Sequence, residues 1–247
     1  MKARESVSSL AGDNPGASSP SEIRVNLDPV DGEAFVKDMD ATLWQILSNR
    51  DAALSRISES AGKADIGILL LGALRAELEA TEIAARWVAS TPELEAKIAF
   101  AQQAGDEARH YQLISERLRE LGNSRAGEDS VTSFSKLFQY LETLTTTGER
   151  IAAAQFTREA IGYKSNQLFI ALCEEVGDTA TARMYTERIQ PDEKRHHEWG
   201  KRLLPHYTAK ASEQELARKA ILRTLELAEE LRSLAAGRLL VETLPGC

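Results

Sequence analysis

The sequence contains one five-residue motif twice, and this repeat limits how the chain can fold. Residues Asp106–His110 and Asp192–His196 both read Asp-Glu-x-Arg-His. In each copy the Glu and the His are three residues apart, so a helix would project both from one face, about 5–6 Å apart at Cβ. A carboxylate and an imidazole at this separation can bind one metal ion. Two copies predict two metal ions or one shared centre, completed by carboxylates from elsewhere in the chain.

Two glutamates elsewhere interrupt helical faces that are otherwise apolar. Glu77 lies on such a stripe in a helix expected over about residues 64–89, and Glu159 takes the same place in a helix expected over about 148–175. Burying an unpaired carboxylate costs on the order of several kcal/mol, so each position needs a cation or hydrogen-bond donors. These two glutamates are therefore candidates for the missing carboxylates.

Hydrophobic periodicity predicts helices along most of the chain, and no stretch alternates as a strand would. Residues 1–30 are rich in Ser, Gly, Pro, Asn and Asp and are expected to form a disordered tail. Residues 31–247 are expected to form a single helical domain, with a metal-binding bundle over about 64–205. The expected helices cover about 33–60, 64–89, 92–121, 131–144, 148–175, 178–205 and 212–239.

The two halves of the predicted bundle match each other. Glu77 precedes Glu107 by 30 residues, and Glu159 precedes Glu193 by 34. Each half is thus predicted to be a helical hairpin with one Glu on its first helix and Glu-x-x-His on its second. Two hairpins packed about a pseudo-twofold axis would bring four carboxylates and two imidazoles to the centre, a ligand set typical of ferritin-like di-iron and di-manganese proteins.

On these residues, the stretch from about 64 to 205 resembles the ferritin-like di-iron carboxylate superfamily. The doubled motif is similar to that of its oxygen-activating branch, which includes the hydroxylase subunits of bacterial multicomponent monooxygenases and the soluble acyl carrier protein desaturases. The resemblance implies an all-α, ferritin-like four-helix bundle with flanking N- and C-terminal helices. It implies that the iron ligands are Glu77, Glu107, His110, Glu159, Glu193 and His196.

The resemblance also assigns roles to the other charged residues of the motif. Asp106 and Asp192 would accept hydrogen bonds from the histidine rings and pair with Arg109 and Arg195. A metal-binding histidine usually donates its second N–H to such a carboxylate, which orients the ring and raises its basicity.

Several other polar residues lie near the predicted ligands. A pocket is expected to include Gln103, Gln155, Tyr163 and Asn166. Glu79 and Glu82 fall on the opposite stripe of their helix and are expected to be surface charges, with a helper ligand as the alternative role for Glu82. His197 is expected to be exposed or adjacent to the ligands. Pro191 interrupts the last ligand-bearing helix and predicts a bend or bulge there.

The donor types favour iron or manganese, because oxygen and imidazole donors occur without a thiolate. The leading hypothesis is a non-haem di-iron oxygenase or oxidase that uses O₂ to hydroxylate, epoxidise or desaturate an organic substrate. The sequence carries no flavin, nicotinamide or iron–sulfur signature, so electrons would come from a ferredoxin or a reductase.

Other functions use the same six ligands. One is a ferroxidase or iron-storage protein, and another is a di-manganese catalase-like enzyme. A non-catalytic partner subunit is a further alternative, although such a subunit would be expected to have lost ligands. The doubled motif and the extra flanking helices favour the oxygenase over a minimal cage subunit.

Composition limits the classes of partner and the cellular compartment expected for this protein. The net charge is −8 without a basic block, which argues against nucleic acid or an anionic membrane. The two cysteines, Cys173 and Cys247, have no zinc-like spacing, and a reduced, cytoplasmic protein accounts for them. The longest apolar run, residues 66–74, is too short to span a bilayer. Long amphipathic outer helices are compatible with a homodimer.

Overall fold

The computed structural model describes residues 31–48, 65–123, 134–239 and 245. Within these residues all regular secondary structure is helical, as the sequence predicts. The expected tail over residues 1–30 and the second half of the helix expected over 33–60 lie outside the described residues. The helices are α1 Gly32–Ser48, α3 Ile66–Ser90, α4 Leu94–Glu120, α5 Lys136–Glu142, α6 Thr147–Ile151, η2 Ala152–Arg158, α7 Glu159–Glu175, α8 Thr179–Met184, η3 Tyr185–Ile189, α9 Gln190–Leu203, η4 Leu204–Tyr207 and α10 Ala211–Leu239.

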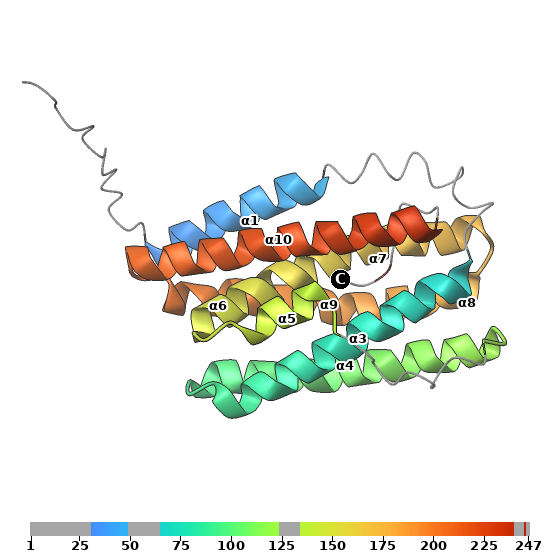
Figure 1. Cartoon of the computed structure of the whole chain (residues 1–247), viewed down its shortest axis with the longest axis horizontal. Helices are drawn as coiled ribbons and strands as arrows, with labels where there is room; N and C mark the ends of the chain where they lie inside the picture. The colour runs from blue at the N-terminus through green and yellow to red at the C-terminus, as the bar shows by residue number, and fades with distance from the viewer. Residues whose placement is uncertain (1–30, 49–64, 124–133, 240–244, 246–247) are drawn as a thin grey trace, which may run out of the picture.

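The helices lie roughly along one direction and form tiers (Figure 1). Helices α3 and α4 pack against each other along one side of the molecule. The continuous segments α6–η2–α7 and α8–η3–α9 form the middle, where α9 contacts both α4 and α7. Helices α1 and α10 cover the side opposite α3 and α4, and α10 packs on η2.

Two of the long helical segments contain a turn of π-helix, in which the hydrogen bonds span five residues instead of four. The segment η3 ends at Ile189, two residues before Pro191. Proline has no N–H to continue the α-helical ladder and its ring crowds the preceding turn, so the prediction of a bulge at Pro191 is confirmed. The other π-helical segment, η2, ends at Arg158, immediately before Glu159.

Two apolar cores lie on either side of a polar layer. One core joins α1, α5, η2 and α10 to the first turns of α4 and includes Phe100. The other joins the first turns of α3 to the end of α4, α7 and α8, and includes Leu74 and Ile114. Glu77 follows Leu74 on α3, and Glu107 lies between Phe100 and Ile114 on α4. The predicted ligands therefore occupy the boundary between the two cores.

Gly200 fixes the closest approach between α9 and the π-helical turn. A Cβ atom at this position would lie 2.6 Å from the backbone N of Phe156 and 2.8 Å from the backbone C of Gln155. These neighbours are backbone atoms and cannot rotate away, so only glycine allows α9 to pack this closely on η2. The contact lies one helical turn from His196 on the same face of α9.

We predict that Gly200→Ala destabilises the fold by about 1–3 kcal/mol, the usual cost of overpacking. The matched control is Gly72→Ala in α3, where a Cβ would meet nothing within 4 Å. That change should stabilise the helix by roughly 0.5–1 kcal/mol through helix propensity. Thermal and urea unfolding of both variants measure the difference, and equal stability of the two would contradict the proposed close packing.

Candidate metal centre

The structure brings all six predicted ligands together. They come from four helical segments, and every side chain is buried. Their donor atoms fall into two groups, each with all its atoms within 4.8 Å of one another. The first group consists of Glu77, Glu107, His110 and Glu193, and the second consists of Glu107, Glu159 and His196.

The first group surrounds one nitrogen of His110. Nδ1 of His110 lies 3.2 Å from Oε2 of Glu107, 3.7 Å from Oε2 of Glu77 and 3.6 Å from Oε1 of Glu193. These carboxylates come from α3, α4 and α9, so the three helices must be packed together for the group to exist.

The second group surrounds the matching nitrogen of His196. Nδ1 of His196 lies 3.2 Å from Oε2 of Glu159 and 3.4 Å from Oε1 of Glu107. Glu107 thus directs one oxygen to each histidine, and its Oε1 has no hydrogen-bond partner among the described residues. A carboxylate shared in this way can bridge two cations.

Each histidine is held by the aspartate of the other motif. Nε2 of His110 lies 3.1 Å from Oδ2 of Asp192, and Nε2 of His196 lies 3.0 Å from Oδ2 of Asp106. When the aspartates accept these Nε2–H bonds, Nδ1 is the nitrogen that faces the carboxylates. The predicted acceptors are therefore present, and the pairing runs between the two halves of the molecule.

Two arginines connect the same aspartates at the surface. Arg109 donates to both Asp106 and Asp192, and Arg195 pairs with the same two carboxylates. The arginine side chains are partly exposed, so these ion pairs cover the outer side of the histidine rings. The four charges tie α4 to α9 next to the ligands.

Burial and charge perturb the acid–base properties of the cluster. Burial raises the pKa of Glu77 to about 7. A hydrogen bond with His110 opposes this increase, and the charge of the neighbouring Glu107 adds to it. Burial, and then repulsion from Glu159, Glu107 and Glu77, raises the pKa of Glu193. Repulsion among carboxylates is what a bound cation would relieve.

The pKa values of Asp106 and Asp192 shift in the opposite direction. Burial alone would raise the pKa of Asp192, but hydrogen bonds from His110, Arg109 and Arg195 hold it below its usual range. Burial acts to raise the pKa of Asp106 as well, but hydrogen bonds from His196 and Arg195 lower it below its usual range. Both aspartates are therefore charged acceptors for the imidazole N–H groups.

The predicted pocket residues have different surroundings. Gln103 donates from Nε2 to Oε1 of Glu159 at 2.7 Å, which holds the second oxygen of that carboxylate. Gln155 and Asn166 are fully buried. Tyr163 is only partly buried and meets Trp44 edge-on at 6.2 Å, with its carbonyl accepting from Gln190. Tyr163 is thus engaged in packing on α1.

Sequence reasoning was wrong about Glu79. This side chain is buried and accepts hydrogen bonds from the backbone N and Oγ of Ser135 at the start of α5. It also accepts from Arg75, one turn earlier on α3. The segment that leads into α5 covers this face of α3. The helical period of α3 alone does not indicate where that segment lies. The companion prediction for Glu82 is consistent with its surface ion pair to Arg86.

Two buried residues near the ligands were missed or only partly anticipated. His197 is buried, contacts the Phe156 carbonyl through Nδ1 at 2.7 Å, and faces Asp40 of α1 through Nε2 at 3.0 Å. Tyr185 is fully buried in the second apolar core, and the charges of Glu77 and Glu193 add to the burial that raises its pKa. The only sequence signal for Tyr185 is its position two turns before Glu193.

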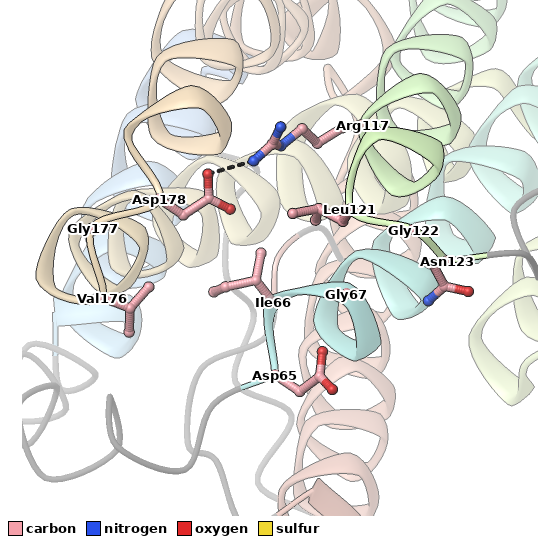
Figure 2. A pocket seen from close by; sticks show the side chains of 10 residues that line it. All are labelled: Asp65, Ile66, Gly67, Arg117, Leu121, Gly122, Asn123, Val176, Gly177 and Asp178. Atoms are coloured by element: carbon pink, nitrogen blue, oxygen red, sulfur yellow. Dashed lines mark hydrogen bonds and ion pairs between the residues drawn. The ribbon is translucent and has the colours of Figure 1, made fainter.

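A surface hollow lies away from the ligands, where the turns at the ends of α4 and α7 meet the start of α3 (Figure 2). Arg117 lines it and donates to Asp178 and Thr181. Arg117 lies seven residues after His110, about 10 Å further along α4. Arg117 and Asp178 pair across the junction between α4 and α8.

No helix among the described residues is both long and apolar enough to cross a membrane. The sequence profile of one protein family, described as a protein of unknown function (DUF455), matches residues 44–231. The match spans most of the chain and all six clustered residues, so the chain belongs to this family. No curated protein and no solved structure matches the chain.

We predict that Glu107→Gln abolishes tight metal binding, because it removes the charge shared by both groups while keeping the side chain's shape. The loss should exceed the roughly 10–100-fold typical of removing an outer hydrogen-bond partner. The control is Glu116→Gln on the exposed face of the same helix. Calorimetric titration with a divalent metal compares them, and similar affinities for both variants would refute the assignment of Glu107.

We predict that Asp192→Asn alters the histidine of the other motif. The imidazole Nε2–H signal of His110 should shift in NMR spectra while that of His196 stays in place, and metal affinity should fall by about 10–100-fold. Asp106→Asn should give the reverse pattern. A shift confined to the histidine of the same motif would contradict the crosswise pairing.

Proposed function

We propose that this member of the DUF455 family is a non-haem di-iron oxygenase or oxidase. The observation that carries the proposal is the position of Glu107, which directs one oxygen to each of two histidine-containing donor groups. With Glu107 shared, the six side chains supply donors for two neighbouring cations rather than one.

The helix arrangement supports a ferritin-like bundle as its scaffold. Helices α3 and α4 form one hairpin, and the α6–η2–α7 and α8–η3–α9 segments form a second that carries the same pattern of Glu followed by Glu-x-x-His. The crosswise bonds of Asp106 and Asp192 relate the two halves to each other. This is the symmetry expected from the internal repeat in the sequence.

The donor set fits iron, with manganese as the closest alternative. Four carboxylates and two imidazoles, with no thiolate among them, suit these metals better than a structural zinc site. Four carboxylate charges also match two divalent ions. When bound, a di-iron centre supplies the capacity to reduce O₂ and oxidise an organic substrate, with electrons from a separate donor such as a ferredoxin or a reductase.

The protein's own residues prepare the site for such chemistry. Asp106 and Asp192 fix the ring orientation of both histidines, and Gln103 fixes Glu159. The apolar cores on both sides exclude bulk water from the ligands, which strengthens electrostatic interactions within the layer. The six side chains are thus held in place by neighbouring groups and are shielded from bulk water.

We predict that the full-length protein, loaded anaerobically with Fe²⁺, binds two irons per chain and consumes O₂ when an electron donor is supplied. Iron analysis, O₂ uptake and size-exclusion chromatography test this together. The Glu107→Gln variant should show neither tight iron binding nor O₂ uptake above that of free iron.

Other outcomes would identify a different function. Uptake of many irons per chain into a large shell would indicate iron storage. Selective binding of manganese with disproportionation of H₂O₂ would indicate a catalase-like enzyme. A folded protein that binds no metal at all would contradict the proposal.

A further inference from the structure

The residues one helical turn from the ligands, toward the turn between α3 and α4, form a distinct layer. Helix α4 and the α6–η2–α7 segment run in the same direction, because Glu93 bonds Thr147 and Gln103 bonds Glu159. Helices α3 and α9 run the opposite way. The layer therefore contains Ala80 of α3, Gln103 of α4, Gln155 of η2 and Gly200 of α9.

Two members of this layer are buried amides with unused hydrogen-bonding groups. Gln155 is 0% exposed, and neither its Oε1 nor its Nε2 has a hydrogen-bond partner among the described residues. Gln103 is 1% exposed; its Nε2 donates to Glu159, but its Oε1 is likewise unpartnered. Buried polar groups are almost always satisfied in proteins, so three such atoms beside one metal group indicate a polar ligand.

The other members leave the layer with very little side chain. Ala80 contributes a methyl group and Gly200 contributes none, and the Gly200 backbone packs directly on Gln155 and Phe156. One turn from the ligands in the opposite direction, the corresponding residues of α3, α4 and α9 are Ala73, Ile114 and Ile189, all buried and apolar, and that of α7 is the half-buried Tyr163. On that side the unpartnered polar atoms include the Tyr185 hydroxyl and Gln190 Oε1, whereas both ends of the Gln155 amide and Oε1 of Gln103 lie on the other side.

The two donor groups of the metal centre also differ. The first offers four side chains, whereas the second, Glu107, Glu159 and His196, offers three. Gln103 bonds Glu159 directly, so the amide layer adjoins the group with fewer protein ligands. A molecule held by the amides would therefore approach the metal on this side.

The charges around the layer limit what such a molecule can be. Its four members include no Lys or Arg, and four buried carboxylates lie one turn away. An anion would be repelled unless a metal neutralised those carboxylates, and a cation would compete with the metal. The unused groups are one amide donor group and two amide acceptors, which match a neutral partner that both donates and accepts.

We propose that Gln103 and Gln155 bind a small, uncharged donor–acceptor group of the substrate, a primary carboxamide or a hydroxyl, beside the Glu159–His196 half of the centre. The assignment of this group to a substrate rests on the proposed oxygenase function. Its binding to the amide layer is a separate property of the chain and can be measured without turnover.

The test uses saturation-transfer NMR on the full-length protein, with and without Zn²⁺ as a diamagnetic metal. Acetamide and acetate serve as neutral and anionic probes of equal size. In the metal-free protein acetamide should bind and acetate should bind more weakly, and in both states Gln155→Met should weaken acetamide binding by about tenfold, the effect of losing one or two modest hydrogen bonds. The matched control is Gln190→Met, a buried glutamine outside the layer whose Oε1 is also unpartnered.

A second variant and a stability measurement separate a binding role from a structural one. Gln155→Glu keeps the side chain's shape but removes its amide donor, so acetamide binding should fall as in Gln155→Met. Metal-free Gln155→Met should unfold at a temperature no lower than that of the unmodified protein, because the amide has no protein partner to lose.

Three results would contradict the proposed binding by Gln103 and Gln155. Tighter binding of acetate than acetamide to the metal-free protein, unchanged acetamide binding in both Gln155 variants, or no acetamide binding at all would each overturn the inference. Metal analysis of the same samples keeps the two proposals apart. Metal binding without Gln155-dependent acetamide binding refutes only this inference, and the reverse result refutes only the di-iron function.

Discussion

The central constraint on this structure is the burial of four carboxylates and two imidazoles between two apolar cores. Such a cluster cannot be stable through solvation: burial, and then repulsion from the neighbouring carboxylates, raises the pKa of Glu193. Burial and repulsion together raise the pKa of Glu77 to about 7. The arrangement is stabilised from outside by the crosswise bonds of Asp106 and Asp192 and by two arginines. These contacts join α4 to α9, and the two apolar cores also connect one half of the molecule to the other.

The positions of the six clustered residues could be predicted because a helix has a fixed period. Glu77 and Glu159 were recognisable as charges on apolar stripes, and the Glu-x-x-His spacing placed each remaining pair on one face. The crosswise pairing of the aspartates could not be predicted, since a motif does not reveal which helix faces it. Glu79 was mistaken for a surface charge for the same reason, because its partner Ser135 belongs to a distant connection.

The π-helical turns show where local sequence was informative and where it was not. Pro191 predicted a bulge before the second motif, and η3 lies there. The turn η2 has no proline, yet it directly precedes Glu159 and receives the close contact of Gly200. A π-turn shifts the phase of the residues that follow it, so η2 affects the direction in which Glu159 leaves its helix. Its Phe156 carbonyl is bound by His197, which connects this turn to Asp40 on α1.

The central claim is that Glu107 lies between two metal ions. Anomalous diffraction at the iron absorption edge, on crystals of the iron-loaded protein, tests it most directly. The account predicts two anomalous peaks, one beside His110 and one beside His196, separated by roughly 3.5–4 Å as in other two-metal sites. A single peak, or peaks that do not contact Glu107, would contradict it.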